Sequence, residues 1–263
     1  ALYDRMLARV FKAGHAGATF GSIGAFDMAL WDIKGKRANM PVYQLLGGKN
    51  REAAAVYVHA DGSEPQEVAD NVRQYMEQGF RYIRVQMGGY GGKSEMMVKP
   101  ENAPSGNYFD PRAYCRNMLN MIEHVRANVG EEIEILHDIH ERLMPIHAVQ
   151  FAKDVEQFKL FFLEDALAPE DIAWFKTMRQ QTATPLAMGE LFNNPHEWQP
   201  LITARLIDRK CGQIGIVQRA LGHHAVHRKA ELFADLRQGQ FSHAKIAPAF
   251  LGQPGMGVFD GAF

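Results

Sequence analysis

The chain has 263 residues, of which 46% are hydrophobic, enough for one large domain or two small ones with a core that needs no disulfide or metal staple. Its 29 lysines and arginines nearly balance 30 aspartates and glutamates, giving a net charge of -1, so nothing in the composition indicates a nucleic-acid partner. No segment has the length of a membrane span. Two distant cysteines, Cys115 and Cys211, and the lack of an apolar leader predict a reducing, cytoplasmic setting.

Apolar runs alternate with amphipathic stretches along the chain. Ile23, Phe26, Leu30 and Ile33 recur at helical spacing, which predicts an amphipathic helix that packs on the domain and stops at "LLGGK". Buried strands are predicted at 54–59, 82–86, 133–138, 160–165 and 185–190. Helices are predicted between them at 65–78, 111–128, 145–157 and 169–180, several with proline in the first turn, where its missing N–H costs nothing.

This alternation of strand and helix predicts a parallel sheet. The later strands follow one another at intervals of about one βα repeat. No glycine-rich phosphate fingerprint follows the first strand, as it would in a doubly wound sheet. The pattern therefore favours an α/β fold of the (β/α)8 TIM-barrel type.

Three acidic residues, Asp138, Glu164 and Glu190, each follow a predicted strand, and both intervals between them are 26 residues. Because one βα repeat leads to the neighbouring strand, the three carboxylates are expected to converge at the carboxyl ends of the strands, where barrel active sites lie. Hard oxygen ligands of this kind suit Mg²⁺. An acid after a strand is often only a helix cap, and the equal spacing is what favours a metal site.

Longer motifs extend this pattern: "GSIGAFDMALWDIKGKRANMPVYQLLGGK" (21–49), "LHDIHER", "FFLEDALAPE" and "AMGELFNNP". From about Gly21 to Asp208 the sequence resembles the enolase superfamily, and within it the mannonate dehydratase group, which includes starvation-sensing proteins. The resemblance implies Mg²⁺ as cofactor and the three acidic residues named above as its ligands. It also implies that His140 is the general acid, and that Arg84 and Tyr90 form a pair in which arginine keeps the phenol ready to act as base.

The predicted second strand departs from the relatives that use a lysine base, because it carries Arg84-Val85-Gln86 where they have Lys-x-Lys. Racemase or cycloisomerase chemistry through such a lysine is therefore disfavoured. Arginine is permanently charged but lowers the pKa of a neighbouring tyrosine. The structural alternatives are a rim salt bridge for Arg84, a covering role for Tyr90 in its glycine-rich loop, and a carbonyl cap for His140.

Two further residues, Gln86 and His137, are candidates for substrate contact. Strand alternation places the side chain of His137 on the face opposite Asp138, where packing is the expected role. His59 ends the first predicted strand and lies where the mouth of a barrel would be. The reaction implied by the resemblance is dehydration of a sugar acid, D-mannonate or a related aldonate, to a 2-keto-3-deoxy acid by a cytoplasmic homo-oligomer with no membrane or nucleic-acid partner.

Three regions are expected: 1–50 as a remnant of the α+β capping domain with its linking helix, 51–208 as the barrel units with the metal site, and 209–263 as a divergent tail. The family pattern has an N-terminal sheet before the first region, and it has further strands where the tail stands. The barrel is thus expected to be incomplete. Two other functions remain open on the sequence alone: a non-catalytic binding or regulatory family member, and an inactive truncated fragment.

Overall fold

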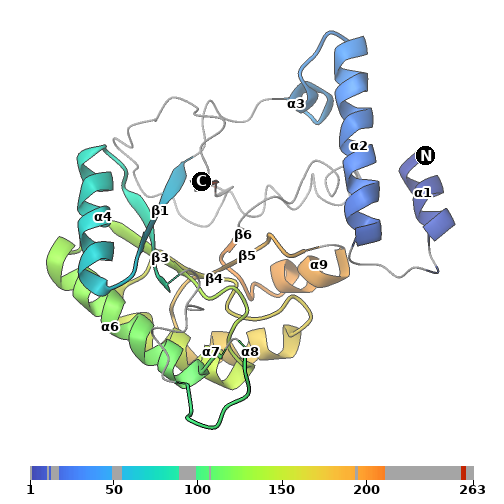
Figure 1. Ribbon diagram of the computed structural model, residues 1–263. Coiled ribbons are helices and arrows are strands. Elements are labelled where there is room, and N and C mark those ends of the chain that lie inside the picture. The colour runs from blue at the N-terminus through green and yellow to red at the C-terminus, as the bar shows by residue number, and fades with distance from the viewer. Residues whose placement is uncertain are drawn as a thin grey trace.

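The computed structural model describes residues 2–10, 12, 18–48, 55–88, 99–106, 108–192, 195–210 and 256–258. Three N-terminal helices stand beside an α/β body (Figure 1): α1 (Leu2–Val10), α2 (Ala18–Arg37) and α3 (Val42–Leu45). The predicted helix is confirmed as part of α2, but it ends at Arg37 and not at "LLGGK". Of the four apolar residues predicted to pack, Ile23 is buried and Leu30 is half-buried, whereas the other two are exposed. Phe26 is 66% exposed and Ile33 52% exposed, because the helices that α2 chiefly contacts are α1 and α3.

The α/β body is built on one sheet with the strand order β6-β5-β4-β3-β2-β1-β7. Neighbours from β1 to β6 pair in parallel, and β7 pairs with β1 antiparallel. The strands are β1 (Val56–Gly62), β2 (Tyr82–Met87), β3 (Glu134–Asp138), β4 (Phe162–Glu164), β5 (Leu186–Met188), β6 (Arg209–Lys210) and β7 (Met256–Val258). Parallel strands in chain order are the arrangement expected for the first part of a (β/α)8 barrel.

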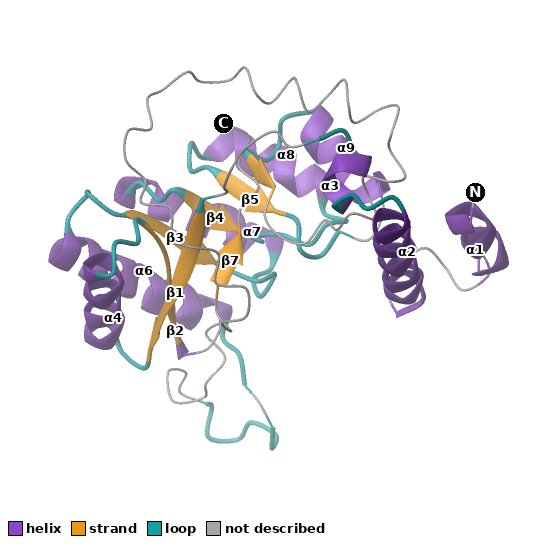
Figure 2. Ribbon diagram, turned by 90° about the horizontal axis from the view of Figure 1, so that it is seen from above, coloured by secondary structure: helices purple, strands orange, loops and turns teal. Residues whose placement is uncertain are grey.

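Helices connect successive parallel strands and lie along the outer side of the sheet (Figures 1 and 2). They are α4 (Pro65–Glu77), α6 (Pro111–Val129), α7 (Pro145–Asp154) with the 3-10 turn η3 (Val155–Phe158), α8 (Ile172–Gln181) and α9 (Pro195–Thr203). Among the described residues, the helices are too short or too polar to span a bilayer.

Proline begins α4, α6 and α7 as predicted, because its fixed φ suits the first helical position. The start of α6 is also capped, since Asp110 Oδ1 accepts from the N–H groups of Arg112 and Ala113. The fourth predicted start, at Pro169, is wrong. Residues 168–171 form a turn closed by the Asp171 N–H on the Ala168 carbonyl, and α8 begins only at Ile172.

Side chains alternate between the two faces of the sheet, and each face has its own core. The helix-facing core is the larger and includes Val58, Ile83, Ile135 and Leu163. The inner core is a small layer formed by Tyr57, Tyr82, Leu136, Phe162 and Ala187. Polar side chains lie on the inner face beyond this apolar layer, toward the carboxyl ends of the strands.

Candidate metal centre

Two strands hold the first candidate ligand between them. Asp138 ends β3, and its carboxylate Oδ2 lies 3.1 Å from Nη1 of Arg84 on β2. Nη2 of the same guanidinium lies 3.8 Å from Asp61 at the end of β1. Gln86, two residues further along β2, donates from Nε2 to the Asp138 carbonyl at 3.1 Å. Arg84 and Gln86, whose side chains point to the same face of β2, therefore both hold Asp138 in position.

Asp138 is almost completely buried, and burial raises its pKa to about 6, although the Arg84 guanidinium opposes that shift. The other carboxylate oxygen, Oδ1, accepts from the backbone N–H of His140 at 2.8 Å. His140 and Glu141 both have positive φ, 53° and 57°. Such angles are uncommon for residues other than glycine and gather at functional sites.

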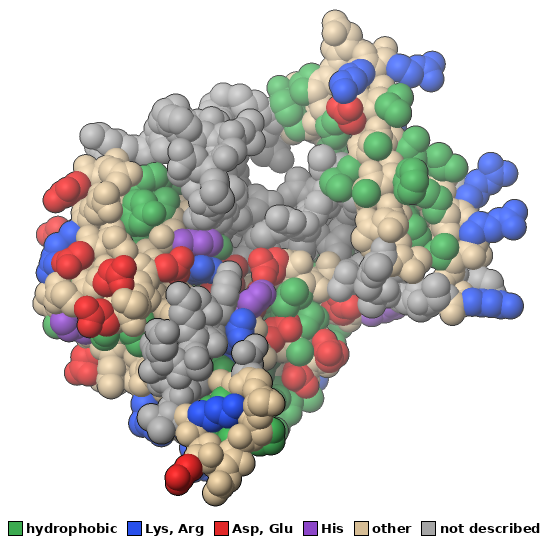
Figure 3. Space-filling view, in the orientation of Figure 1, with side chains coloured by type: hydrophobic (Ala, Val, Ile, Leu, Met, Phe, Trp, Pro, Cys, Tyr) green, Lys and Arg blue, Asp and Glu red, His purple; other side chains and the backbone are tan. Residues whose placement is uncertain are grey.

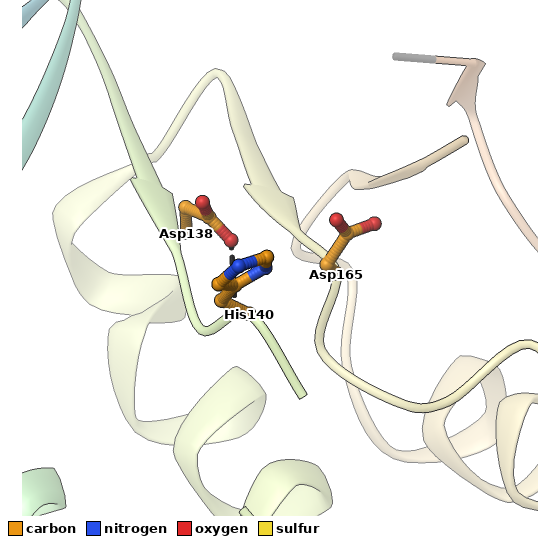
Figure 4. Close-up of side chains that lie close together, drawn as sticks. All are labelled: Asp138, His140 and Asp165. Carbon is orange, nitrogen blue, oxygen red and sulfur yellow. Dashed lines mark hydrogen bonds between the residues drawn. The ribbon is translucent and has the colours of Figure 1, made fainter. Parts of the chain in front are cut away.

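A third side chain joins Asp138 and His140. Ligand atoms of Asp138, His140 and Asp165 all lie within 4.8 Å of one another, and Figure 4 shows the imidazole between the two carboxylates. Asp165 directly follows β4 with φ 42°, and its carbonyl accepts the N–H of Glu141 at 2.9 Å. Its side chain is 0% exposed, and among the described residues neither carboxylate oxygen has a hydrogen-bond partner.

Asp165 carries a strongly perturbed carboxyl group. Burial, followed by the charge of the adjacent Glu164, raises its pKa to about 9. A buried carboxyl group with no partner avoids charge unless a cation compensates it. Asp165 was not among the predicted site residues; the acid pair Glu164-Asp165 at the strand end marks it only as a second acid, and its direction depends on its positive φ.

The other two predicted ligands, Glu164 and Glu190, lie in the same region, but each contacts a different residue. Glu164 ends β4 opposite Asp138 in the strand register, is 4% exposed, and accepts from the Tyr57 hydroxyl at 3.2 Å. Glu190 lies in the turn after β5, with Oε1 3.4 Å from Nδ1 of His140. The group within 4.8 Å thus contains Asp165 and not Glu164 or Glu190, because Glu164 is directed toward Tyr57 and Glu190 approaches from a turn.

His59, which the sequence placed only at the mouth, lies on β1 paired with Arg84 in register. Its ring stacks on that of Tyr57 at 5.5 Å between centroids. Burial, then the charge of Arg84, lowers its pKa to about 4, so the ring is neutral at pH 7. Its Nε2 is buried without a partner among the described residues and is available to a ligand on the inner face.

His137 lies on the helix-facing side of the sheet, as the alternation indicates. It is 0% exposed, with Nε2 3.0 Å from the Tyr114 hydroxyl of α6 and Nδ1 2.9 Å from the Val85 carbonyl. The structure therefore does not bring this substrate-contact candidate to the other site residues, and packing explains it. Gln86 is on the inner face beside Asp138. Tyr90 lies outside the described residues.

Charged groups of both signs meet at this end of the sheet. On the face shown in Figure 3, acidic, histidine and basic side chains gather near the middle, over the region where the strands end. The pKa of Glu141 shows that carboxylates are in excess there. Burial raises this pKa to about 7, and the negative charge of Glu170 is the next largest cause. Oxygen donors in excess, with one imidazole, are suited to a divalent cation.

The sheet is parallel and of the barrel type, and carboxylates, an arginine and a histidine lie at the carboxyl ends of its strands. This arrangement is typical of α/β-barrel proteins that bind a cation at that end of the barrel. Comparison with protein families makes this more specific. The enolase C-terminal domain-like family matches residues 67–232, and the mandelate racemase / muconate lactonizing enzyme N-terminal domain matches 4–47. The chain belongs to the enolase superfamily, which confirms the resemblance seen in the sequence.

Curated relatives place the chain more closely. It is 51% identical over 191 residues to a D-galactonate dehydratase family member of Enterocloster bolteae, with 71% of this chain and 47% of the relative covered. It is 50% identical over 205 residues to the family member RspA of Pantoea ananatis, with 71% of this chain and 49% of the relative covered. The chain thus spans about half the length of the curated relatives it matches.

Solved structures agree. An enolase from Pantoea ananatis with bound D-gluconate and Mg is 48% identical, with a TM-score of 0.65, and the match covers 70% of this chain and 48% of that one. The 3,6-anhydro-D-galactonate cycloisomerase of Zobellia galactanivorans, 23% identical with a TM-score of 0.67 over 88% of this chain and 58% of that chain, shows the shared fold alone.

Proposed function

We propose that this chain carries the metal and proton-transfer residues of a Mg²⁺-dependent sugar-acid dehydratase that converts D-mannonate or a related aldonate to the 2-keto-3-deoxy acid. The observation that carries the proposal is the clustering of Asp138, Arg84 and His140 at the strand ends, within a chain about half identical to D-galactonate dehydratase family members. The relative from Pantoea ananatis solved with D-gluconate and Mg supports both the substrate class and the ion.

The donor set fits magnesium. Asp138 and Glu164 are register partners on neighbouring strands, and Glu190 reaches the same region through its contact with His140. All three are carboxylates, the ligands that this hard cation prefers. When bound, Mg²⁺ supplies charge stabilisation for the enediolate that forms when the α-proton of a carboxylate is removed.

Proton transfer falls to other residues. His140 protonates the C3 hydroxyl as it departs, and Glu190 Oε1, 3.4 Å from its Nδ1, stabilises the protonated imidazole that this role needs. Arg84 stands two residues before Gln86 on β2 and holds a fixed positive charge at the site. With Tyr90 it forms the proposed pair that takes the proton at C2. The neutral ring of His59 is a further group that can donate or accept a hydrogen bond to a sugar hydroxyl.

The test is turnover of an aldonate panel by the purified chain with Mg²⁺, with the 2-keto product followed as its semicarbazone. We expect one aldonate to be dehydrated, and His140→Asn to lower the rate by about 10²- to 10⁴-fold, the usual contribution of a general acid. Absence of turnover on every aldonate, with Mg²⁺ still bound, would replace this proposal by the non-catalytic alternative. Sedimentation of the same sample tests the proposed homo-oligomer.

A further inference from the structure

Asp165 is not explained by the proposed reaction. Both of its carboxylate oxygens are buried and have no hydrogen-bond partner among the described residues. Its neighbours are another buried carboxylate and an imidazole, which lie with it inside a 4.8 Å group. A buried carboxylate is normally paired, bound to a metal, or kept neutral, and here two potential metal ligands already lie close to it (Figure 4).

We propose that Asp138, His140 and Asp165 form a second cation site, which takes Zn²⁺ and which shares Asp138 with the proposed Mg²⁺ site. It uses His140 and Asp165 in place of Glu164 and Glu190. The chemical class follows from the donors: an imidazole nitrogen with two carboxylates suits zinc, whereas magnesium prefers oxygen donors alone.

The spacing of the ligand atoms is compatible with a tetrahedral zinc ion. Bonds from zinc to nitrogen and oxygen are about 2.0–2.2 Å long, so the ligands of a tetrahedral ion lie roughly 3.4 Å apart. Ligand atoms already within 4.8 Å therefore need only small side-chain movements to close on the ion. The backbone fixes their starting positions, because the His140 N–H bonds to Asp138 Oδ1 at 2.8 Å and the Glu141 N–H bonds to the Asp165 carbonyl at 2.9 Å.

An outer partner for the imidazole is present as well. Glu190 Oε1 lies 3.4 Å from Nδ1 of His140. With Nε2 bound to zinc, the Nδ1–H group donates to this carboxylate, the usual arrangement that orients a metal-bound histidine. Glu190 would thus orient the imidazole that binds zinc, whereas it would bind magnesium directly.

We expect zinc and magnesium to compete, because both proposed sites use Asp138, and Glu190 serves one as a direct ligand and the other as the hydrogen-bond acceptor of His140. Zinc bound to Nε2 of His140 would also prevent this imidazole from acting as the general acid. On the proposed function, zinc therefore inhibits dehydration by removing both a magnesium ligand and the general acid. The binding claim itself does not depend on that function.

Three isosteric variants separate the two sites: Asp165→Asn, Glu164→Gln and Asp138→Asn. Equilibrium dialysis against ZnCl₂ or MgCl₂ at pH 7.5, followed by elemental analysis, counts each ion per chain. We expect Asp165→Asn to lose one zinc equivalent, with affinity lowered on the order of a hundredfold or more, since loss of an outer partner alone costs 10- to 100-fold. It should keep magnesium. Glu164→Gln should keep zinc and lose magnesium, and Asp138→Asn should lose both.

Other histidines of the chain also bind zinc weakly, so the deciding quantity is the difference between wild type and Asp165→Asn in the same dialysis. Equal zinc content at equal affinity would overturn the proposal, as would simultaneous binding of one Zn²⁺ and one Mg²⁺ in the wild type. Circular dichroism of each variant confirms that the fold is kept. If the chain has no dehydratase activity but Asp165→Asn still loses zinc while Glu164→Gln keeps it, the zinc site is supported and the proposed function alone is refuted.

Discussion

Asp165→Asn is expected to stabilise the protein at neutral pH in the absence of divalent ions. The folded-state pKa of Asp165 is about 9, against an ordinary value of 3.8. Between these values the folded state holds a proton that the unfolded state has released, so stability falls as pH rises. The group contributes no penalty below pH 3.8 and its full penalty above pH 9.

The magnitude follows from linkage. Each pH unit above 3.8 costs about 1.4 kcal/mol while the folded carboxyl stays protonated, so the cost at pH 7 is about 4 kcal/mol. Asparagine has nearly the same shape as the neutral acid, carries no proton to lose, and is among the residues that best tolerate a positive φ. The variant should therefore gain on the order of 4 kcal/mol at pH 7, and less at lower pH.

Urea unfolding in EDTA at pH 5, 6, 7 and 8 measures this directly. The difference between variant and wild type should grow by about 1.4 kcal/mol per pH unit. Asp154→Asn is a matched control, because its carboxylate is only half-buried and accepts from Gln150 on the surface of α7. A pH-independent difference, or a loss of stability in Asp165→Asn, would refute the account of Asp165 as a buried acid without a partner.

Three further outcomes are expected. Glu190→Gln should abolish Mg²⁺ binding in calorimetry while the melting temperature stays nearly unchanged, and retained affinity would refute its assignment as a ligand. Mg²⁺ affinity should fall about tenfold per pH unit below pH 6, because the pKa of Asp138 is about 6 and the proton must leave first; a flat profile from pH 5 to 7 would contradict this. Burial lowers the pKa of His137 to about 4 from 6.5, so wild type should lose about 3 kcal/mol between pH 6.5 and 4, a loss that His137→Asn should lack.

The sequence predicted the elements that depend on local signals. Proline at the first helical position located the starts of α4, α6 and α7, and apolar runs located the buried strands. The start of α8 was missed because Pro169 begins a turn before the helix. The exposure of Phe26 was missed because spacing reveals that a helix has an apolar face but not what that face contacts.

The face of the sheet on which a site residue lies was predictable wherever the side chains of a strand alternate regularly. Asp138 and Glu164 share the inner face, and His137 faces the helices, as the period of two requires. Asp165 escaped prediction because continued alternation would turn it away from Glu164's face. The strand ends at Glu164, and the positive φ of Asp165 returns its side chain to the neighbourhood of His140. Such a backbone reversal has no signature in the spacing of residues.

The charge balance explains why this end of the sheet should bind a cation at all. Asp138, Glu141 and Asp165 all have raised pKa values, with burial as the largest cause and neighbouring carboxylates adding to it. Arg84 relieves only Asp138 among them, because its guanidinium contacts that carboxylate at 3.1 Å. A divalent ion on Asp138 would lower the cost of ionising its neighbours too. Metal binding should therefore release protons, and potentiometric titration during Mg²⁺ addition at pH 6 would detect none if the carboxylates were already ionised.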